Sequence, residues 1–186
     1  MDQPKIITER LKLRLIEITD LEAIHTLHIL PETDKYNTLG IPKNLEETKR
    51  VIIPWVAANK LSEITNYTFA IILKETDEFM GLFGLRLGDK KYSRAEVWYK
   101  LHLNFWNKGY ATESLKAILN FGFNTLNLHR IEAGCAVENV GSAKVMEKVG
   151  MTKEGRKRQI LPLKTGWSDS FEYAILNSDK PNYTTI

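Results

Sequence analysis

Alternating apolar positions predict a series of β-strands along the chain. Leu11, Leu13 and Leu15 recur at every second residue near the N-terminus, and a period of two is typical of a strand that buries one face. Turn-forming residues separate the later runs of the same kind. Further strands are predicted at residues 67–73, 79–87, 94–101, 131–137, 151–163 and 168–176.

Apolar residues that recur at spacings of three and four predict four helices. The first begins near Asp20, and the second runs from about 45 to 61. Pro54 lies inside the second helix and is expected to kink or divide it, because proline has no N–H group to donate. The spacing becomes helical again after Gly109, and a last helix is predicted at 142–149.

The order of these elements is strand, two helices, three strands, helix, strand, helix and two strands. This order is typical of a mixed α/β (α+β) fold. It predicts a mostly antiparallel central sheet of about seven strands, flanked by four helices. Residues 1–186 contain no internal repeat and no Pro/Gly/Ser-rich linker, so we expect one domain.

Composition narrows the possible partners. The chain has 26 basic and 23 acidic residues, and this balance does not favour nucleic acid as a partner. No apolar run approaches the length of a membrane span and no secretory signal is visible, so a cytoplasmic protein without membrane contact is expected. The single cysteine, Cys135, excludes an internal disulfide framework, and the four histidines show no metal-binding spacing.

The segment 103–112 joins a predicted strand to a predicted helix and carries small residues at the junction, Gly109 and Ala111. The first amides of a helix have no partner within the helix, and the helix dipole adds positive charge there. With Lys108 beside them, these amides could bind a pyrophosphate. The glycine patterns of nucleoside triphosphate and dinucleotide loops are both absent. The alternative is a simple helix start that contains a convenient glycine.

The residues Trp106-Asn107-Lys108-Gly109-Tyr110-Ala111-Thr112-Glu113-Ser114-Leu115 resemble the acetyl-CoA loop and helix of the GNAT superfamily of N-acetyltransferases. They look closest to the RimJ/RimL branch, the ribosomal-protein N-terminal acetyltransferases. Asn107 departs from that branch, where glycine is usual. Asparagine is the next most tolerant residue if this position requires a positive φ.

Other segments match the same branch in the same order along nearly the whole chain. The segment 138–151, which begins Glu138-Asn139, is similar to its E-N-x-x-S-x-x-V-x-E-K-x-G-F signature, with Met151 in place of the final phenylalanine. Shorter matches lie at residues 8–14, 95–99, 128–133, 166–169 and 173–174.

The resemblance implies a GNAT fold whose sheet is splayed between its fourth and fifth strands. It also implies acetyl-CoA as the acetyl donor and CoA as a product, with no metal. The expected cofactor contacts are Leu101, Leu103, Trp106, Asn107, Lys108, Gly109, Tyr110, Ala111, Thr112, Asn139 and Ser142.

Two side chains are candidates for the chemistry. Along 94–101, alternation places Glu96 on the same face as Trp98, and the resemblance puts this strand beside the thioester. Glu96 is therefore a candidate general base, directly or through a water; the alternative is a solvated strand residue. Ser142 stands where RimL-like enzymes use a serine to protonate the leaving sulfur; its alternative role is capping the helix near Asn139.

The sequence says less about which residues contact the acceptor amine. Trp55, Trp98 and Trp167, together with Tyr36, are candidate walls of the substrate site. The alternative is a core position, which is the more common one for an aromatic residue. Some RimL-type relatives carry an acidic residue at the position of Leu161, which this chain lacks.

The sequence thus predicts an acetyl-CoA-dependent N-acetyltransferase that acts on a primary amine, with a protein N-terminal α-amine as the first candidate acceptor. A small-molecule amine, such as a polyamine, amino acid or aminoglycoside, is the second. A non-catalytic acetyl-CoA-binding interaction module is the alternative from another class. Either a monomer or a homodimer is compatible with the sequence.

Overall fold

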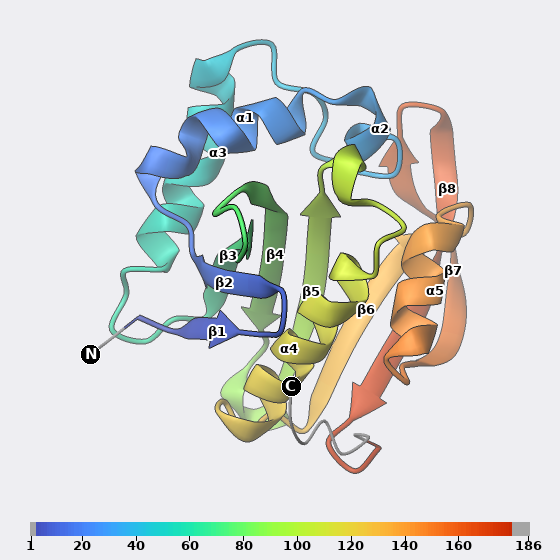
Figure 1. The fold of residues 1–186 in the computed structure, drawn as a ribbon. Helices are drawn as coiled ribbons and strands as arrows, with labels where there is room; N and C mark the ends of the chain where they lie inside the picture. Colours follow the sequence, from blue (N-terminus) through green and yellow to red (C-terminus); the bar gives the residue numbers. More distant parts are fainter. Residues whose placement is uncertain (1–2, 180–186) are drawn as a thin grey trace.

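The computed structural model describes residues 3–179, which form one eight-stranded sheet with the strand order β1-β2-β3-β4-β5-β6-β8-β7 (Figure 1). The strands are β1 (Lys5–Ile7), β2 (Leu11–Leu15), β3 (Asn66–Leu73), β4 (Phe79–Leu87), β5 (Arg94–Leu101), β6 (Arg130–Ala136), β7 (Thr152–Leu163) and β8 (Gly166–Leu176). The helices are α1 (Leu21–His28), α2 (Pro31–Asp34), α3 (Leu45–Ala58), α4 (Tyr110–Asn124) and α5 (Val140–Lys148), with short 3-10 turns η1 (Ile18–Asp20), η2 (Lys90–Tyr92) and η3 (Leu103–Phe105).

The sheet opens between β5 and β6. All other neighbouring strands are antiparallel, whereas β5 and β6 are parallel and pair only from Arg94–Arg130 to Glu96–Glu132. Beyond Glu96 the two strands diverge toward their C-terminal ends (Figure 1). Strands β5 and β6 are the fourth and fifth of the strands predicted from the sequence, so the expected splay is present. It leaves the end of β5 without a strand neighbour on that side, so its backbone polar groups are available to other partners.

Two apolar cores lie on opposite faces of the sheet. On one face α4 and α5 pack over the larger cluster, which includes Leu115 and Ile131. On the other face α1 and α3 pack against β3 and β4 through residues such as Ile24 and Ile52. The alternation predicted for 94–101 is confirmed, because Val97 belongs to the larger core whereas Trp98 contacts Trp55 of α3.

The described residues form one strand and one helix more than the predicted total of about seven strands and four helices. The missed strand, β1, has three residues, and the missed helix, α2, has four. Neither is long enough to display a period, and each is held by neighbours instead. Strand β1 pairs with β2, and α2 is one turn that begins with a proline at its N-terminus.

Pro54 does not divide the second helix, which runs without a break from Leu45 to Ala58. Pro54 is exposed, whereas Ile52 and Val56 on the opposite side are buried against the sheet. Water can therefore satisfy the carbonyl group that the proline leaves without a donor, while packing holds the rest of the helix.

Among residues 3–179, no helix combines the length and apolar character needed to cross a bilayer. Cys135 is buried in β6, and burial raises the pKa of its thiol to about 11. It is therefore a packing residue rather than a nucleophile.

Candidate active site

A cavity of about 700 Å³ lies where β5 separates from β6. Four parts of the chain meet there: α2 and the residues after it, the end of β5, the segment from η3 into α4, and the start of α5. The lining residues are Glu32, Thr33, Lys35, Tyr36, Asn37, Tyr99, Lys100, Leu101, Phe105, Trp106, Asn107, Gly109, Tyr110, Ala111, Thr112, Glu138, Asn139, Val140, Gly141, Ser142, Lys144, Val145 and Lys148.

The N-terminus of α4 faces this cavity without a side-chain cap. Gly109 is the N-cap residue with φ of 84°, and no side chain accepts a hydrogen bond from the helix start. The first helical bond runs from the N–H of Glu113 to the carbonyl of Gly109, 3.0 Å away. The amides that precede Glu113 are therefore free to bind an anion, in a helix of fifteen residues with its full dipole.

Asn107 has φ of 60°, in the left-handed region. This explains why asparagine can replace glycine here, because its short polar side chain tolerates that conformation better than most others. The indole N–H of Trp106 donates to the carbonyl of Leu101 at 2.8 Å and so ties the loop to the end of β5.

Arg10 and Glu113 hold the first turn of α4 in place. The Nε atom of Arg10 donates to Glu113 at 2.7 Å, and its Nη1 atom donates to the carbonyl of Lys108 at 3.1 Å. Burial opposes ionisation of Glu113, but hydrogen bonds from Thr8 and Arg10 outweigh it and lower its pKa. Arg10 also covers the ring of Tyr110, 4.3 Å from the ring centroid.

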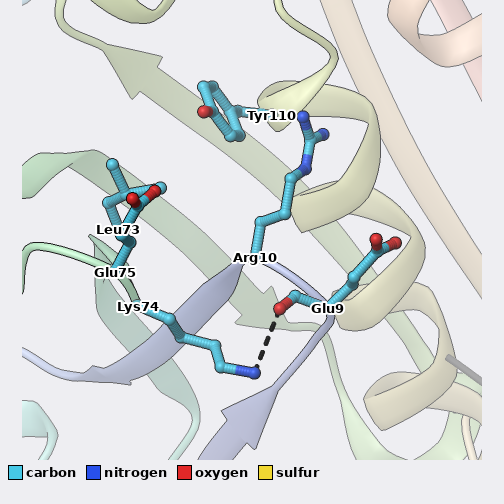
Figure 2. Close-up of a pocket in the computed structure, with 6 residues that line it drawn as sticks. All are labelled: Glu9, Arg10, Leu73, Lys74, Glu75 and Tyr110. Carbon is cyan, nitrogen blue, oxygen red and sulfur yellow. Dashed lines mark hydrogen bonds between the residues drawn. The ribbon is translucent and has the colours of Figure 1, made fainter.

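Arg10 and Tyr110 also border a second, smaller cavity of about 340 Å³, whose lining residues are drawn in Figure 2. Lys74 closes one side of it by donating to the carbonyl of Glu9 at 3.0 Å. No predicted site residue other than Tyr110 lines this smaller cavity. Its polar groups connect the residues before β2 with the end of β3 and the start of α4.

The start of α5 brings two hydroxyl groups together. Asn139 is the N-cap residue, and its side chain accepts a hydrogen bond from the N–H of Ser142 at 3.1 Å. The hydroxyl of Ser142 instead lies 3.0 Å from that of Tyr99 on β5. Burial raises the pKa of Tyr99 to about 12, even though the hydrogen bond with Ser142 acts in the opposite direction. Tyr99 therefore stays protonated and can donate.

Nine of the eleven predicted cofactor residues line the larger cavity: Leu101, Trp106, Asn107, Gly109, Tyr110, Ala111, Thr112, Asn139 and Ser142. Leu103 and Lys108 do not. Leu103 is partly exposed in η3, and Lys108 contributes its carbonyl group to Arg10.

The predicted base and the predicted tryptophan walls lie outside the cavity lining. The side chain of Glu96 is 51% exposed and forms an ion pair with Arg86 on β4. Trp55 and Trp98 pack together with ring centroids 5.5 Å apart. Trp167 is 66% exposed on β8. Of the aromatic residues proposed for the acceptor side, Tyr36 alone belongs to the lining.

A buried polar cluster adjoins the cavity on the α1 and α2 side. His28, Asp34 and Lys100 are 1%, 2% and 5% exposed. Burial lowers the pKa of His28 to about 4, so its ring is neutral at neutral pH. Burial also lowers the pKa of Lys100 to about 8, against the opposing charge of Asp34. Asp34 forms an ion pair with Lys164 at 2.9 Å. Within residues 3–179, no cluster of three or more histidine, cysteine or acidic residues is placed to hold a metal.

Tyr99 and Lys100 are site residues that the sequence analysis did not identify. The only available signal was the position of Lys100 near the end of the predicted strand 94–101, next to the glycine-containing loop. A lysine is rarely found fully buried unless it has a partner or a function.

Comparison with known proteins agrees with this fold. Residues 10–152 match the acetyltransferase (GNAT) domain family, and the chain belongs to it. It is an N-acetyltransferase of a family that uses acetyl-CoA. One relative, the uncharacterized N-acetyltransferase p20 of Bacillus licheniformis, is 34% identical over 92% of this chain and 96% of its own.

Solved structures show the same fold. A GNAT-family acetyltransferase from Bacillus anthracis has a TM-score of 0.82 at 31% identity, covering 94% of this chain and 99% of that one. A spermidine N-acetyltransferase from Vibrio cholerae, solved with CoA and spermine, has a TM-score of 0.81 at 23% identity, covering 92% and 98%. At that identity the likeness concerns the fold and does not identify the acceptor.

Proposed function

We propose that this protein transfers the acetyl group of acetyl-CoA to the α-amine at the N-terminus of a protein, as RimJ/RimL enzymes do. The observation that carries this proposal is one cavity that joins the uncapped start of α4, the unpaired end of β5 and the hydroxyl pair of Tyr99 and Ser142.

The residues of this cavity fit the donor. The free amides around Ala111 are suited to the pyrophosphate, and Lys144 and Lys148 on α5 add positive charge to the same cavity. The unpaired edge of β5 near Leu101 offers backbone groups to the pantetheine arm and to the carbonyl oxygen of the acetyl group. Acetyl-CoA supplies the acetyl group as an activated thioester.

The hydroxyl pair is suited to return a proton to the departing sulfur. Asn139 caps α5 through the amide of Ser142, so the serine hydroxyl is not used in capping. Tyr99 can donate to Ser142 while Ser142 donates to the sulfur. A thiol has an ordinary pKa of about 8.5, so the sulfur needs only modest assistance.

An α-amine is the acceptor that suits this lining best. Its pKa is about 7.7–8.0, whereas that of a lysine-type amine is about 10.4, so it loses its proton near neutral pH with less help from a base. The lining contains two carboxylates, of which Glu138 accepts a hydrogen bond from Ser168 and Glu32 is exposed. Glu96 stays a prediction as the base and would act through a water, because Arg86 holds its carboxylate outside the lining.

The acceptor assignment is tested by release of the CoA thiol in the presence of acetyl-CoA and a panel of amines. We expect turnover with peptides that have a free N-terminus, and none with the same peptides blocked at the N-terminus but containing lysine. Turnover with polyamines or aminoglycosides alone would favour the small-molecule alternative. Tight CoA binding without turnover on any amine would favour the non-catalytic module. Cytoplasmic location and oligomeric state stay predictions.

A further inference from the structure

Unsatisfied buried polar atoms gather at one place in this protein. Among the described residues, five buried side-chain atoms make no hydrogen bond, and four of them belong to His28, Asp34 and Lys100. One of the four, an oxygen of Asp34, still has an ion pair with Lys164, so Nδ1 of His28, the other oxygen of Asp34 and Nζ of Lys100 are the unpaired atoms. His28 ends α1 and Asp34 ends α2, the next helix, whereas Lys100 lies in β5, far from both in the sequence. Buried polar groups in native proteins are nearly always hydrogen-bonded, so a cluster of exceptions calls for an explanation such as a missing ligand.

Lys100 is the member of this cluster that belongs to the cavity lining, and its buried Nζ atom would turn toward the cavity to meet a ligand. It lies on β5 opposite Leu82 of β4, and it lines the cavity together with its neighbours Tyr99 and Leu101. It is 5% exposed, and its Nζ atom has no hydrogen-bond partner. An unpaired buried ammonium group costs free energy, so Lys100 does not serve to stabilise the fold. With a pKa of about 8, it is mostly charged at neutral pH.

Binding of the donor, acetyl-CoA, does not explain why a lysine stands at position 100. Alternation along β5 directs Tyr99 toward the α4 and α5 side, where it meets Ser142. Lys100 points to the opposite face, the side of the sheet that α1 and α3 cover, where His28 and Asp34 lie. The lysines near the donor groups, Lys144 and Lys148, are on α5 instead.

Lys164 balances the charge of Asp34, the anion that acts on Lys100. The two form an ion pair at 2.9 Å, whereas the Nζ atom of Lys100 has no hydrogen-bond partner. Lys144, Lys148 and the amides at the start of α4 are assigned to the donor, so they do not bear on the acceptor. Lys100 therefore carries a positive charge without a close partner, which favours an anionic group and disfavours a polycation.

We propose that Lys100 is a specificity-determining residue of the acceptor site and binds a carboxylate that the acceptor carries close to its amine. This inference rests on the proposed function and narrows its substrate class to amino-carboxylates, such as peptides whose first residue is acidic. The carboxylate supplies the hydrogen-bond acceptor that Lys100 lacks within the protein, and it holds the neighbouring amine in the cavity.

The test uses two peptides that differ only in having aspartate or asparagine as the first residue. We expect the wild-type protein to acetylate the aspartate peptide with a kcat/KM higher by at least about tenfold, since hydrogen bonds to charged groups have effects of this size. In Lys100→Met the ratio should fall to about one, mainly through loss on the aspartate peptide. Lys60→Met, which removes an exposed lysine outside the cavity, should keep the wild-type ratio.

Several results would overturn the role of Lys100. Equal rates for both peptides with the wild-type protein would do so, as would an unchanged ratio in Lys100→Met. An equal loss on both peptides, with a shifted pH profile, would make Lys100 a proton acceptor rather than a selector. If the wild-type protein acetylated neither peptide, the proposed function itself would fail. The thermal midpoint of Lys100→Met should be no lower than that of wild type, because methionine removes an unpaired buried charge.

Discussion

Replacing Ala111 with aspartate should weaken acetyl-CoA binding by about 100-fold or more, because it puts a carboxylate beside the expected pyrophosphate. Like charges a few ångströms apart repel each other by several kcal/mol at a protein surface. Ala111 is the second residue of α4 and lines the cavity. An acidic residue in the first turn of a helix also stabilises that helix by about 0.3–1 kcal/mol. The variant should therefore fold at least as well as wild type.

Titration calorimetry with CoA measures this effect directly. Ala111→Ser is the matched control, since serine, like aspartate, is small and polar but carries no charge. This variant should bind CoA almost as tightly as wild type does. A dissociation constant for Ala111→Asp close to the wild-type value would show that the α4 amides do not hold the pyrophosphate.

Removal of the Ser142 hydroxyl should lower kcat by up to about 100-fold, the lower range of effects seen for general acid–base groups. The KM for acetyl-CoA should change little, because the donor contacts that we propose are the α4 amides and the α5 lysines and do not include this hydroxyl. Tyr99→Phe should have a similar effect, because the two hydroxyls lie 3.0 Å apart and form one donor chain. The double variant should be no slower than the worse single one.

Steady-state kinetics of Ser142→Ala, Tyr99→Phe and the double variant test this coupling. Ser142→Thr, which keeps a hydroxyl, is the control and should retain more activity than Ser142→Ala. Since Asn139 is the cap of α5, Ser142→Ala should not lower the thermal midpoint. Multiplicative losses in the double variant would mean that the two hydroxyls act independently, and an unaffected kcat would remove Ser142 from proton transfer.

Alternation along β5 directs Tyr99 and Lys100 to opposite faces of the sheet. Tyr99 meets the donor elements α4 and α5, whereas Lys100, the next residue, faces α1 and α2. Consecutive residues of one strand can therefore serve the two substrates separately.

Much of the fold could be predicted because most elements bury one regular face. Leu11, Leu13 and Leu15 of β2 are all buried, as the alternation indicated. The short elements β1 and α2 could not be found in this way, and α2 supplies part of the cavity. The continuity of α3 through Pro54 depends on the exposure of that residue, which periodicity alone does not reveal.

Most of the residues predicted to contact the cofactor line one cavity, because they lie in two short continuous segments around Gly109 and Asn139. The remaining contacts join distant parts of the chain. Tyr99 and Ser142 are 43 positions apart and meet only where the sheet has opened. The approach of Lys100 to Asp34 depends on where α2 packs, so no local pattern could reveal it.

A crystal structure of the protein with CoA will show whether the donor occupies the cavity between β5 and β6. We predict that the pyrophosphate will contact the amides at the start of α4 and that the sulfur will lie next to the hydroxyl of Ser142. A CoA molecule bound elsewhere, for example in the smaller cavity beside Arg10 and Lys74, or a sulfur far from Ser142, would contradict this account.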